Sequence, residues 1–251
     1  MKSLIQEKLY EIEKRENCRI LLAVESGSRA WGFVSSNSDY DVRFIYVRSI
    51  ESYLKLNRPR DVIELSTNGV LDINGWDLEK MLKLLHKSNP TVFEWLSSPI
   101  VYQTTNFVET LKAAMQHYFS PKSALWHYLQ MAEKNYRGYL RGDMVKAKKY
   151  FYVLRPILAC RWILERGSIP PMQFSELAAS QLPNYLDETV AKLLDLKMNS
   201  SETRLIPRAD ILNAYIEQSF VEIHDVAQQY PKESIKGWDE LDELFLTALD
   251  R

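Results

Sequence analysis

The sequence predicts an α/β (α+β) fold, in which a small mixed sheet with flanking helices is followed by an all-helical C-terminal region. Two observations predict it. Residues 1 to about 100 alternate β-rich runs with turn residues, whereas from about residue 104 apolar residues recur at helical spacing and no convincing strand is found. Since 251 residues suffice for one large domain or two modest ones, we expect domains at 1–102 and 103–251.

Each element of the first part has a local signal. Apolar residues at helical spacing predict one helix that ends near Asn17 and another over 76–87. Apolar and β-branched runs bounded by turn residues predict strands at 19–25, 39–47, 62–65 and 70–74. Because turn residues rather than long helices connect these strands, we expect antiparallel pairs.

Proline and glycine divide the second part into about six helices. The breaks fall at Ser120-Pro121, Gly142, 167–171, Pro183 and Pro207. The step Arg155-Pro156 lies inside a long apolar stretch and predicts a kink or a helix break there.

The composition excludes several classes of protein. Hydrophobic residues make up 46% of the chain and charged residues 26%, which argues against disordered and low-complexity chains. The formal charge is 32 − 33 = −1, so contact with a polyanion must be a local patch. Cys18 and Cys160 lack ligand-like spacing, and there is neither a secretory signal nor an apolar stretch of about 18 to 20 residues. We therefore expect a cytoplasmic protein without membrane contact.

The turn after the first strand has the features of a phosphate cradle. Gly27-Ser28 lies where this strand passes into what we expect to be a short helix. Backbone N–H groups, a hydroxyl and a helix N-terminus could all face an anion there. Arg29 follows and could touch phosphate or nearby carboxylates. Strand-Gly-Ser turns also occur for conformational reasons alone, so the turn by itself is a weak signal.

Two carboxylates follow at the start of the second strand. Asp39 and Asp41 are two residues apart, and such residues share one face of a strand at about 6.5 to 7 Å between Cα atoms. Two acids so placed repel each other unless a cation lies between them, and they could hold divalent metal. Arg43 shares this face and is the expected counter-ion of Asp39 and Asp41 without metal. As an alternative, both acids are solvated residues at the start of a strand.

A third carboxylate is needed if metal is to align a hydroxyl for deprotonation. Asp72 lies in a short apolar strand, where a charged side chain is costly unless it is paired or metal-bound. Asp61 and Glu64 are the competitors, and we prefer Asp72 because Glu64 could be an edge-strand charge. Asp77 is expected to be a helix N-cap or first-turn acid.

Together these residues resemble the polymerase-β-like nucleotidyltransferase superfamily. The likeness begins with Gly27-Ser28, which is followed after about a dozen residues by Asp39-Tyr-Asp41-Val. It is completed by an aspartate on a later strand. A more specific likeness links the chain to the predicted bacterial and phage nucleotidyltransferases associated with RNA repair. It lies in residues 27–32, 38–46, 73–78, 87–96 and 150–163. The likeness extends to roughly residue 165.

The resemblance implies transfer of a nucleoside monophosphate from an NTP to a hydroxyl, with release of pyrophosphate and with Mg²⁺ or Mn²⁺. By matched position, Gly27 and Ser28 would hold the phosphates. Asp39 and Asp41 would bind metal, and Asp72 would complete the site and activate the acceptor. Phosphoryl transfer asks a protein chiefly for positioning and charge neutralisation, so a histidine base is not required. We expect the four histidines to be ordinary surface or core residues.

A basic stretch could complete the site. Between residues 141 and 166 there are seven basic and two acidic residues. We expect Lys149 and Arg155 to contact triphosphate or acceptor, or alternatively to pair with internal acids. The expected acceptor is an RNA end. A protein hydroxyl, as in adenylylation, and a non-catalytic nucleotide sensor are the alternatives.

Overall fold

The computed structural model describes residues 1–35, 38–66, 69–199, 204–231 and 236–250, and these form two compact units. Unit 1 comprises 1–30, 39–119 and 235–251, and unit 2 comprises 31–38 and 120–234. This division differs from the expected boundary between 102 and 103. Two helices beyond residue 102 pack with the sheet unit, and a short segment after the Gly27-Ser28 turn packs with the helical unit.

Five strands of unit 1 form one mixed sheet in the order β3-β4-β2-β1-β5. Their bounds are β1 (Cys18–Glu25), β2 (Tyr40–Arg48), β3 (Val62–Ser66), β4 (Leu71–Asp77) and β5 (Val101–Thr104). The four predicted strands are confirmed, whereas β5 was not predicted. β1 pairs antiparallel with β2 and β5, and β3 with β4, but β2 and β4 are parallel. The expectation of antiparallel pairs is therefore wrong for β2 and β4.

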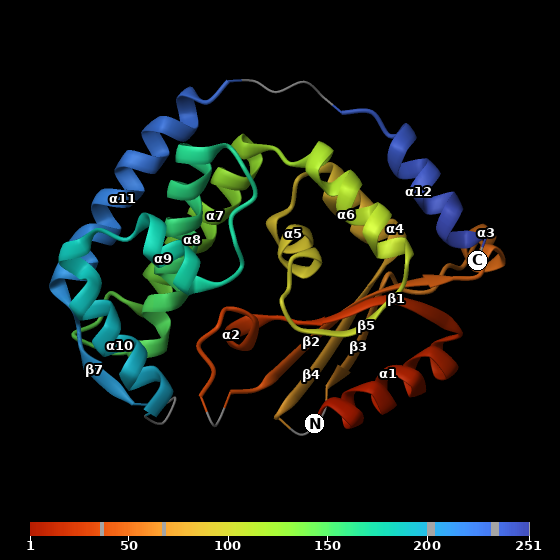
Figure 1. Ribbon diagram of the computed structural model, residues 1–251, viewed down its shortest axis with the longest axis horizontal. Helices are drawn as coiled ribbons and strands as arrows, with labels where there is room; N and C mark the ends of the chain where they lie inside the picture. The colour runs from red at the N-terminus through yellow and green to blue at the C-terminus, as the bar shows by residue number, and fades with distance from the viewer. Residues whose placement is uncertain (36–37, 67–68, 200–203, 232–235, 251) are drawn as a thin grey trace. The chain divides into compact units, whose positions relative to one another are not determined.

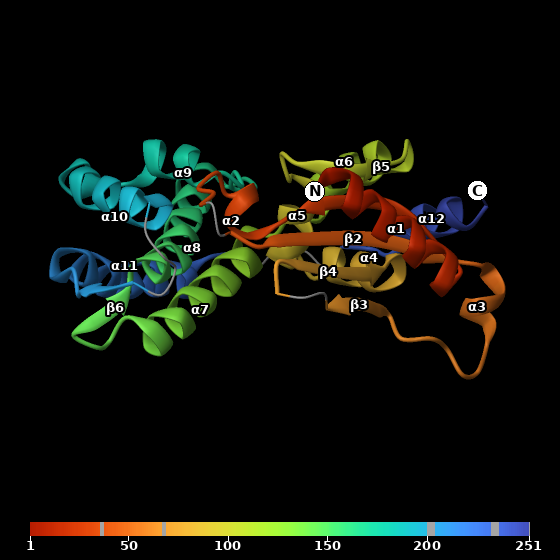
Figure 2. The same ribbon diagram turned by 90° about the horizontal axis from the view of Figure 1, so that it is seen from below.

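Helix α1 (Lys2–Glu16) covers one face of this sheet, as Figure 1 and Figure 2 show. Its buried residues pack into one core cluster with Val42, Phe44 and Tyr46 of β2. Because side chains alternate along a strand, Asp41 and Arg43 belong to the opposite face. Asn17 ends α1 in the left-handed conformation, at the predicted position.

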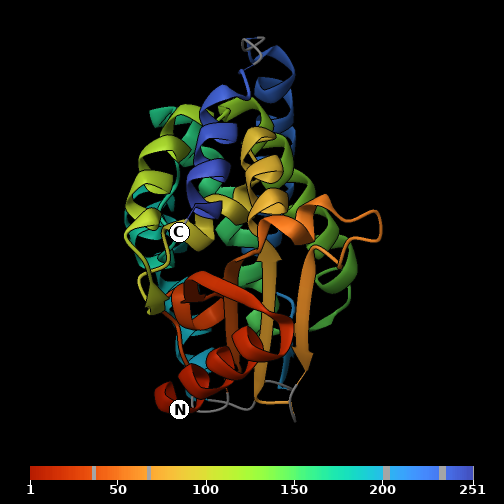
Figure 3. The ribbon, with the colours of Figure 1, turned by 90° about the vertical axis from the view of Figure 1, so that its right-hand side faces the viewer.

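Further helices of unit 1 lie on the other side of the sheet from α1, visible in Figure 3. These are α4 (Leu78–His86), α5 (Pro90–Leu96), α6 (Phe107–Tyr118) and α12 (Asp239–Leu249). The short helices α2 (Gly27–Ala30) and α3 (Ile50–Leu54) follow β1 and β2. The C-terminal α12 contacts α4, α6 and β2, so residues more than 120 positions apart complete this layer.

Strand β4 continues three residues beyond its predicted end. Gly75 makes this possible, because a Cβ atom there would overlap the ring of Phe44. The following helix therefore begins at Leu78 rather than at Trp76. Asp77 is its N-cap and accepts a hydrogen bond from the Glu79 N–H at 2.9 Å, which confirms the prediction for Asp77.

Replacing Asp77 with Asn should stabilise the protein above pH 6 by about 1 to 3 kcal/mol. Burial raises the pKa of Asp77 to about 6. The folded state then binds the proton more tightly than the unfolded chain, so the free energy of unfolding falls as pH rises from about 4 to about 6. Asn removes this loss and keeps the capping oxygen. Urea unfolding at pH 4 and pH 7.5 tests this, and an equal effect at both pH values would contradict it.

Unit 2 is helical, with α8 (Ala147–Arg166) at its centre and α7, α9, α10 and α11 in contact with it. The surrounding helices are α7 (Pro121–Tyr139), α9 (Phe174–Gln181), α10 (Asp187–Asn199) and α11 (Asp210–Gln229). A 3₁₀ turn (Asn184–Leu186) and the strand pair β6 (Met144–Lys146) and β7 (Leu205–Pro207) complete the described part of this unit. No strand was predicted here, so β6 and β7 correct the prediction. Among the described helices of the chain, none is long and apolar enough to cross a membrane.

A kink or a helix break was predicted at Arg155-Pro156, and of these the break does not occur, because helix α8 continues through Pro156. Pro156 itself is buried, as are most of its neighbours on α8. Packing on several sides holds the helix together although proline removes one backbone hydrogen bond.

Candidate active site

The turn after β1 lies against Asp41. α2 begins at Gly27, which has a φ of +61°, and a Cβ atom at this position would overlap Oδ2 of Asp41 and lie 3.1 Å from its Cγ. A glycine is therefore required both by the left-handed backbone and by the close approach of the carboxylate. The fold thus brings Gly27 and the neighbouring Ser28, both predicted to hold phosphate, next to one predicted metal ligand.

Replacing Gly27 with Ala should lower nucleotide transfer about a hundredfold, because a displacement of about 1 Å in a catalytic group can have this effect. The added methyl group must push the Asp41 carboxylate away from the turn. Gly167→Ala is a matched control, since Gly167 has a φ of +60° but open space around the position of a Cβ atom. Steady-state rates of both variants test this, and an equal loss in both would assign the effect to backbone strain.

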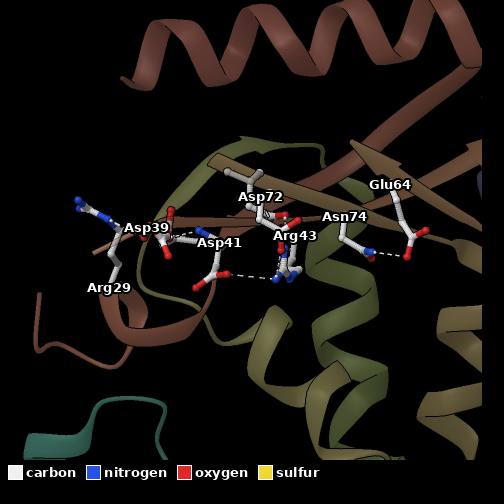
Figure 4. Close-up of polar contacts among 9 residues, drawn as sticks. Arg29, Asp39, Asp41, Arg43, Glu64, Asp72 and Asn74 are labelled. Atoms are coloured by element: carbon white, nitrogen blue, oxygen red, sulfur yellow. Dashed lines mark hydrogen bonds and ion pairs between the residues drawn. The ribbon is translucent and has the colours of Figure 1, made fainter. Parts of the chain in front are cut away.

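Asp41 and Asp72 face each other across the parallel strands β2 and β4, where they are register partners. Arg43 lies between the two carboxylates: one guanidinium nitrogen is 3.2 Å from Oδ1 of Asp41 and 2.8 Å from Oδ2 of Asp72 (Figure 4). The predicted role of Arg43 as a counter-ion is confirmed for Asp41, and its second partner is Asp72. A positive charge thus occupies the position between the acids, which stabilises two neighbouring negative charges.

Asp39 lies just before β2 and is more exposed than Asp41. Its backbone carbonyl accepts a hydrogen bond from Nε of Arg29 at 3.2 Å, and the Arg29 guanidinium lies 3.6 Å from the ring centroid of Tyr40. Arg29 is therefore held beside Asp39, at one end of the row formed by Asp39, Asp41 and Asp72 (Figure 4). This arrangement fits its predicted contact with phosphate, which stays a prediction.

Of the competitors for the third carboxylate, Asp72 lies nearest to the other acids. Glu64 is on β3, where it accepts a hydrogen bond from Asn74 and lies 3.5 Å from a guanidinium nitrogen of Arg60. Asp61 instead pairs with Lys80 at 3.1 Å. The geometry therefore supports Asp72. Asp72 is paired, as expected for a charge in an apolar strand, and its side chain is also 56% exposed. Its charge is balanced by Arg43 and by water.

Burial raises the pKa of Asp41, an effect that Arg43 opposes and that the negative charge of Asp72 reinforces. A charged Asp41 is thus disfavoured in the folded protein unless a cation lies close to it. Glu25 lies directly behind Asp41, and burial raises its pKa as well.

The donors fit a divalent metal in their chemistry, because Mg²⁺ and Mn²⁺ prefer carboxylate oxygens. Asp41 and Asp72 already share one cation, the Arg43 guanidinium. However, within the described residues no three His, Cys, Asp or Glu side chains come together as a ready metal site. A metal would need Asp39 as a further ligand, and it would compete with Arg43 for the carboxylates of Asp41 and Asp72.

The two predicted cationic residues lie on α8, in unit 2. Arg155 is 2% exposed, donates from Nε to the Met172 carbonyl at 3.2 Å, and has its guanidinium 4.8 Å from the ring centroid of Trp31. Lys149 is only partly buried and lies over the rings of Tyr139 and Tyr152, at 3.7 and 4.9 Å. The contacts of Arg155 indicate a structural role in unit 2. Contact of either residue with triphosphate or acceptor stays a prediction.

Replacing Arg155 with Met should lower the free energy of unfolding by about 2 to 4 kcal/mol, because a buried carbonyl loses a charged donor and Trp31 loses a cation. Lys149→Met on the same helix should change stability by less than about 1 kcal/mol and weaken NTP binding about tenfold. Urea unfolding and NTP titration distinguish the two. If Arg155→Met weakens NTP binding without loss of stability, its role is in the site and not in the core.

Sequence reasoning gave no role to Glu25 or Tyr102. Oε1 of Glu25 accepts a hydrogen bond from the Asp41 N–H at 2.8 Å, and Oε2 accepts one from the Tyr102 hydroxyl. The sequence signal that could have identified Glu25 is a charged residue at the end of the buried run Ile-Leu-Leu-Ala-Val-Glu.

The histidines lie on helices as expected; His86, for example, stacks on Trp238 at 3.7 Å.

Comparisons with known proteins agree with the resemblance seen in the sequence. A family model described as "RlaP: RNA repair pathway DNA polymerase beta family" matches residues 1–247. The chain is 44% identical to "Uncharacterized protein YcgL" of Bacillus subtilis (strain 168), over 100% of this chain and 97% of that relative. A crystal structure of a nucleotidyltransferase-like protein from Exiguobacterium sibiricum 255-15 is 15% identical with a TM-score of 0.32, covering 96% of this chain and 79% of that one. That TM-score is too low to support an inference. The relationship of this chain to the family therefore rests on the match to the family model.

Proposed function

Because the chain belongs to the RNA repair pathway DNA polymerase beta family, we propose that it is a metal-dependent nucleotidyltransferase that moves an NMP from an NTP to a hydroxyl of an RNA end. One observation carries the proposal. The carboxylates of Asp41 and Asp72 face one cation across adjacent strands, beside a Gly27-Ser28 turn that approaches Asp41 too closely for any other residue.

In the proposed reaction the acceptor oxygen forms a bond to the α-phosphorus, and the bond from this phosphorus to the bridging oxygen of pyrophosphate breaks. The hydroxyl proton passes to a carboxylate, for which Asp72 is the candidate, or to water. The backbone at Gly27 and Ser28 orients the β- and γ-phosphates, and Arg29 neutralises part of their charge.

Asp39, Asp41 and Asp72 are the residues that would hold Mg²⁺ or Mn²⁺. Such ions neutralise the phosphates and make the acceptor hydroxyl easier to deprotonate. Without metal, Arg43 balances the charges of Asp41 and Asp72. Once metal took this place, Arg43 would be free to approach a phosphate.

Labelling with each α-³²P-NTP, with Mg²⁺ or Mn²⁺ and a panel of RNA ends and proteins, tests the proposal. Label that appears on RNA and requires Asp41 supports it. Label on a protein hydroxyl would instead assign adenylylation of a partner. Binding of NTP without transfer to any acceptor would assign a nucleotide sensor.

A further inference from the structure

We propose that Glu25 is a positioning residue of the acidic site, which together with Tyr102 fixes the backbone of Asp41 and hence the direction of its carboxylate. The inference rests on the proposed function, since it concerns the side chain expected to meet metal and phosphate. Glu25 itself is shielded from substrate, because it is 0% exposed.

Both carboxylate oxygens of Glu25 are bonded, one to each strand that flanks β1. Oε1 accepts from the Asp41 N–H of β2 at 2.8 Å, and Oε2 accepts from the hydroxyl of Tyr102 on β5. The Glu25 backbone is held too: its N–H donates to the Ile100 carbonyl at 2.9 Å, and its carbonyl accepts from Oγ of Ser98 at 2.6 Å. A buried carboxylate is tolerated only with partners of this kind.

The Asp41 N–H depends on this side chain because β1 ends at this point. The carbonyl of Asp41 still accepts from the Ser26 N–H at 2.8 Å, but the chain then turns away at Gly27. In a longer strand the Ser26 carbonyl, opposite Asp41, would accept from the Asp41 N–H, but among the described residues this hydrogen bond is not formed. Oε1 of Glu25 takes the place of that carbonyl and extends the β1–β2 pairing by one hydrogen bond.

This extra bond sets the direction of a carboxylate that has little freedom. Asp41 packs against the α-carbon of Gly27 on one side and pairs with Arg43 on the other. A small shift of the Asp41 backbone would therefore change its contact with the turn, its distance to Asp72, or both. Outer groups that orient a metal ligand typically change metal affinity about 10- to 100-fold when removed.

Three variants of the full chain test the inference. Glu25→Leu removes both acceptors at similar size, and Tyr102→Phe removes only the anchor of Oε2. Glu25→Gln keeps an acceptor for the Asp41 N–H and places an amide donor toward the Tyr102 hydroxyl. Ser98→Ala is the matched control, because it removes a buried hydrogen bond to the Glu25 backbone and leaves the side-chain bonds in place.

Two readouts besides transfer are measured: Mn²⁺ binding, followed by electron paramagnetic resonance of the free ion, and hydrogen exchange of the Asp41 amide by NMR. Glu25→Leu should weaken Mn²⁺ binding about tenfold and speed exchange of the Asp41 amide, with Tyr102→Phe intermediate. Glu25→Gln should restore both to within about threefold of the original protein. Ser98→Ala should alter neither beyond about twofold.

The inference is overturned if Glu25→Leu folds with unchanged Mn²⁺ binding and amide exchange, or if Glu25→Gln is as damaging as Glu25→Leu. Should Glu25→Leu not fold, Tyr102→Phe decides by the same two readouts. If the original protein neither transfers nucleotide nor binds Mn²⁺, the proposed function fails, and exchange of the Asp41 amide alone decides the role of Glu25.

Discussion

Replacing Asp41 with Asn should reduce nucleotide transfer at least about a thousandfold, because loss of several kcal/mol of charge stabilisation has this effect on a rate. Asn keeps the shape of the side chain but removes the charge that faces Arg43 and the expected metal. The same loss is expected for Asp39→Asn.

The metal-free stability of the Asp41→Asn variant should be unchanged or slightly raised. Burial already raises the pKa of Asp41, so the folded protein favours a neutral group there. Arg43 keeps Asp72 as its partner at 2.8 Å. Asp61→Asn, in an exposed acid paired with Lys80, serves as the control and should retain transfer. If Asp41→Asn unfolds several degrees earlier and still transfers nucleotide, the acid is structural and the assignment of the site is wrong.

Replacing Asp72 with Asn should lower the maximal rate several hundredfold, whereas Glu64→Gln should change it less than about threefold. The difference arises from strand pairing: Asp72 is the register partner of Asp41, and Glu64 lies one strand further away, opposite Asn74. Both acids are exposed, so neither change should affect stability by more than about 0.5 kcal/mol.

Single-turnover rates at saturating NTP provide the measurement, because they isolate the chemical step from binding. A large loss in Glu64→Gln together with normal transfer by Asp72→Asn would exchange the two roles. A large loss in both would mean that the sheet carries a wider acidic site than Asp41, Asp72 and Arg43 indicate.

Local sequence patterns are sufficient to predict the features that depend on neighbouring residues. The Gly27-Ser28 turn, the helix end at Asn17 and the N-cap at Asp77 all follow from local backbone and capping chemistry, and the structure confirms these three elements. The family could likewise be inferred from short motifs, because their residues lie close together on one strand and the turn before it.

Which distant residues meet is visible only in the folded chain. The parallel pairing of β2 and β4 brings Asp72, rather than Glu64, to Asp41, and β5 supplies the Tyr102 hydroxyl to Glu25. Packing also carried α8 through Pro156 and placed α12 with the sheet. Pairing and packing are set by the free energy of burying whole faces against one another, a sum over segments far apart in the chain that no local pattern contains.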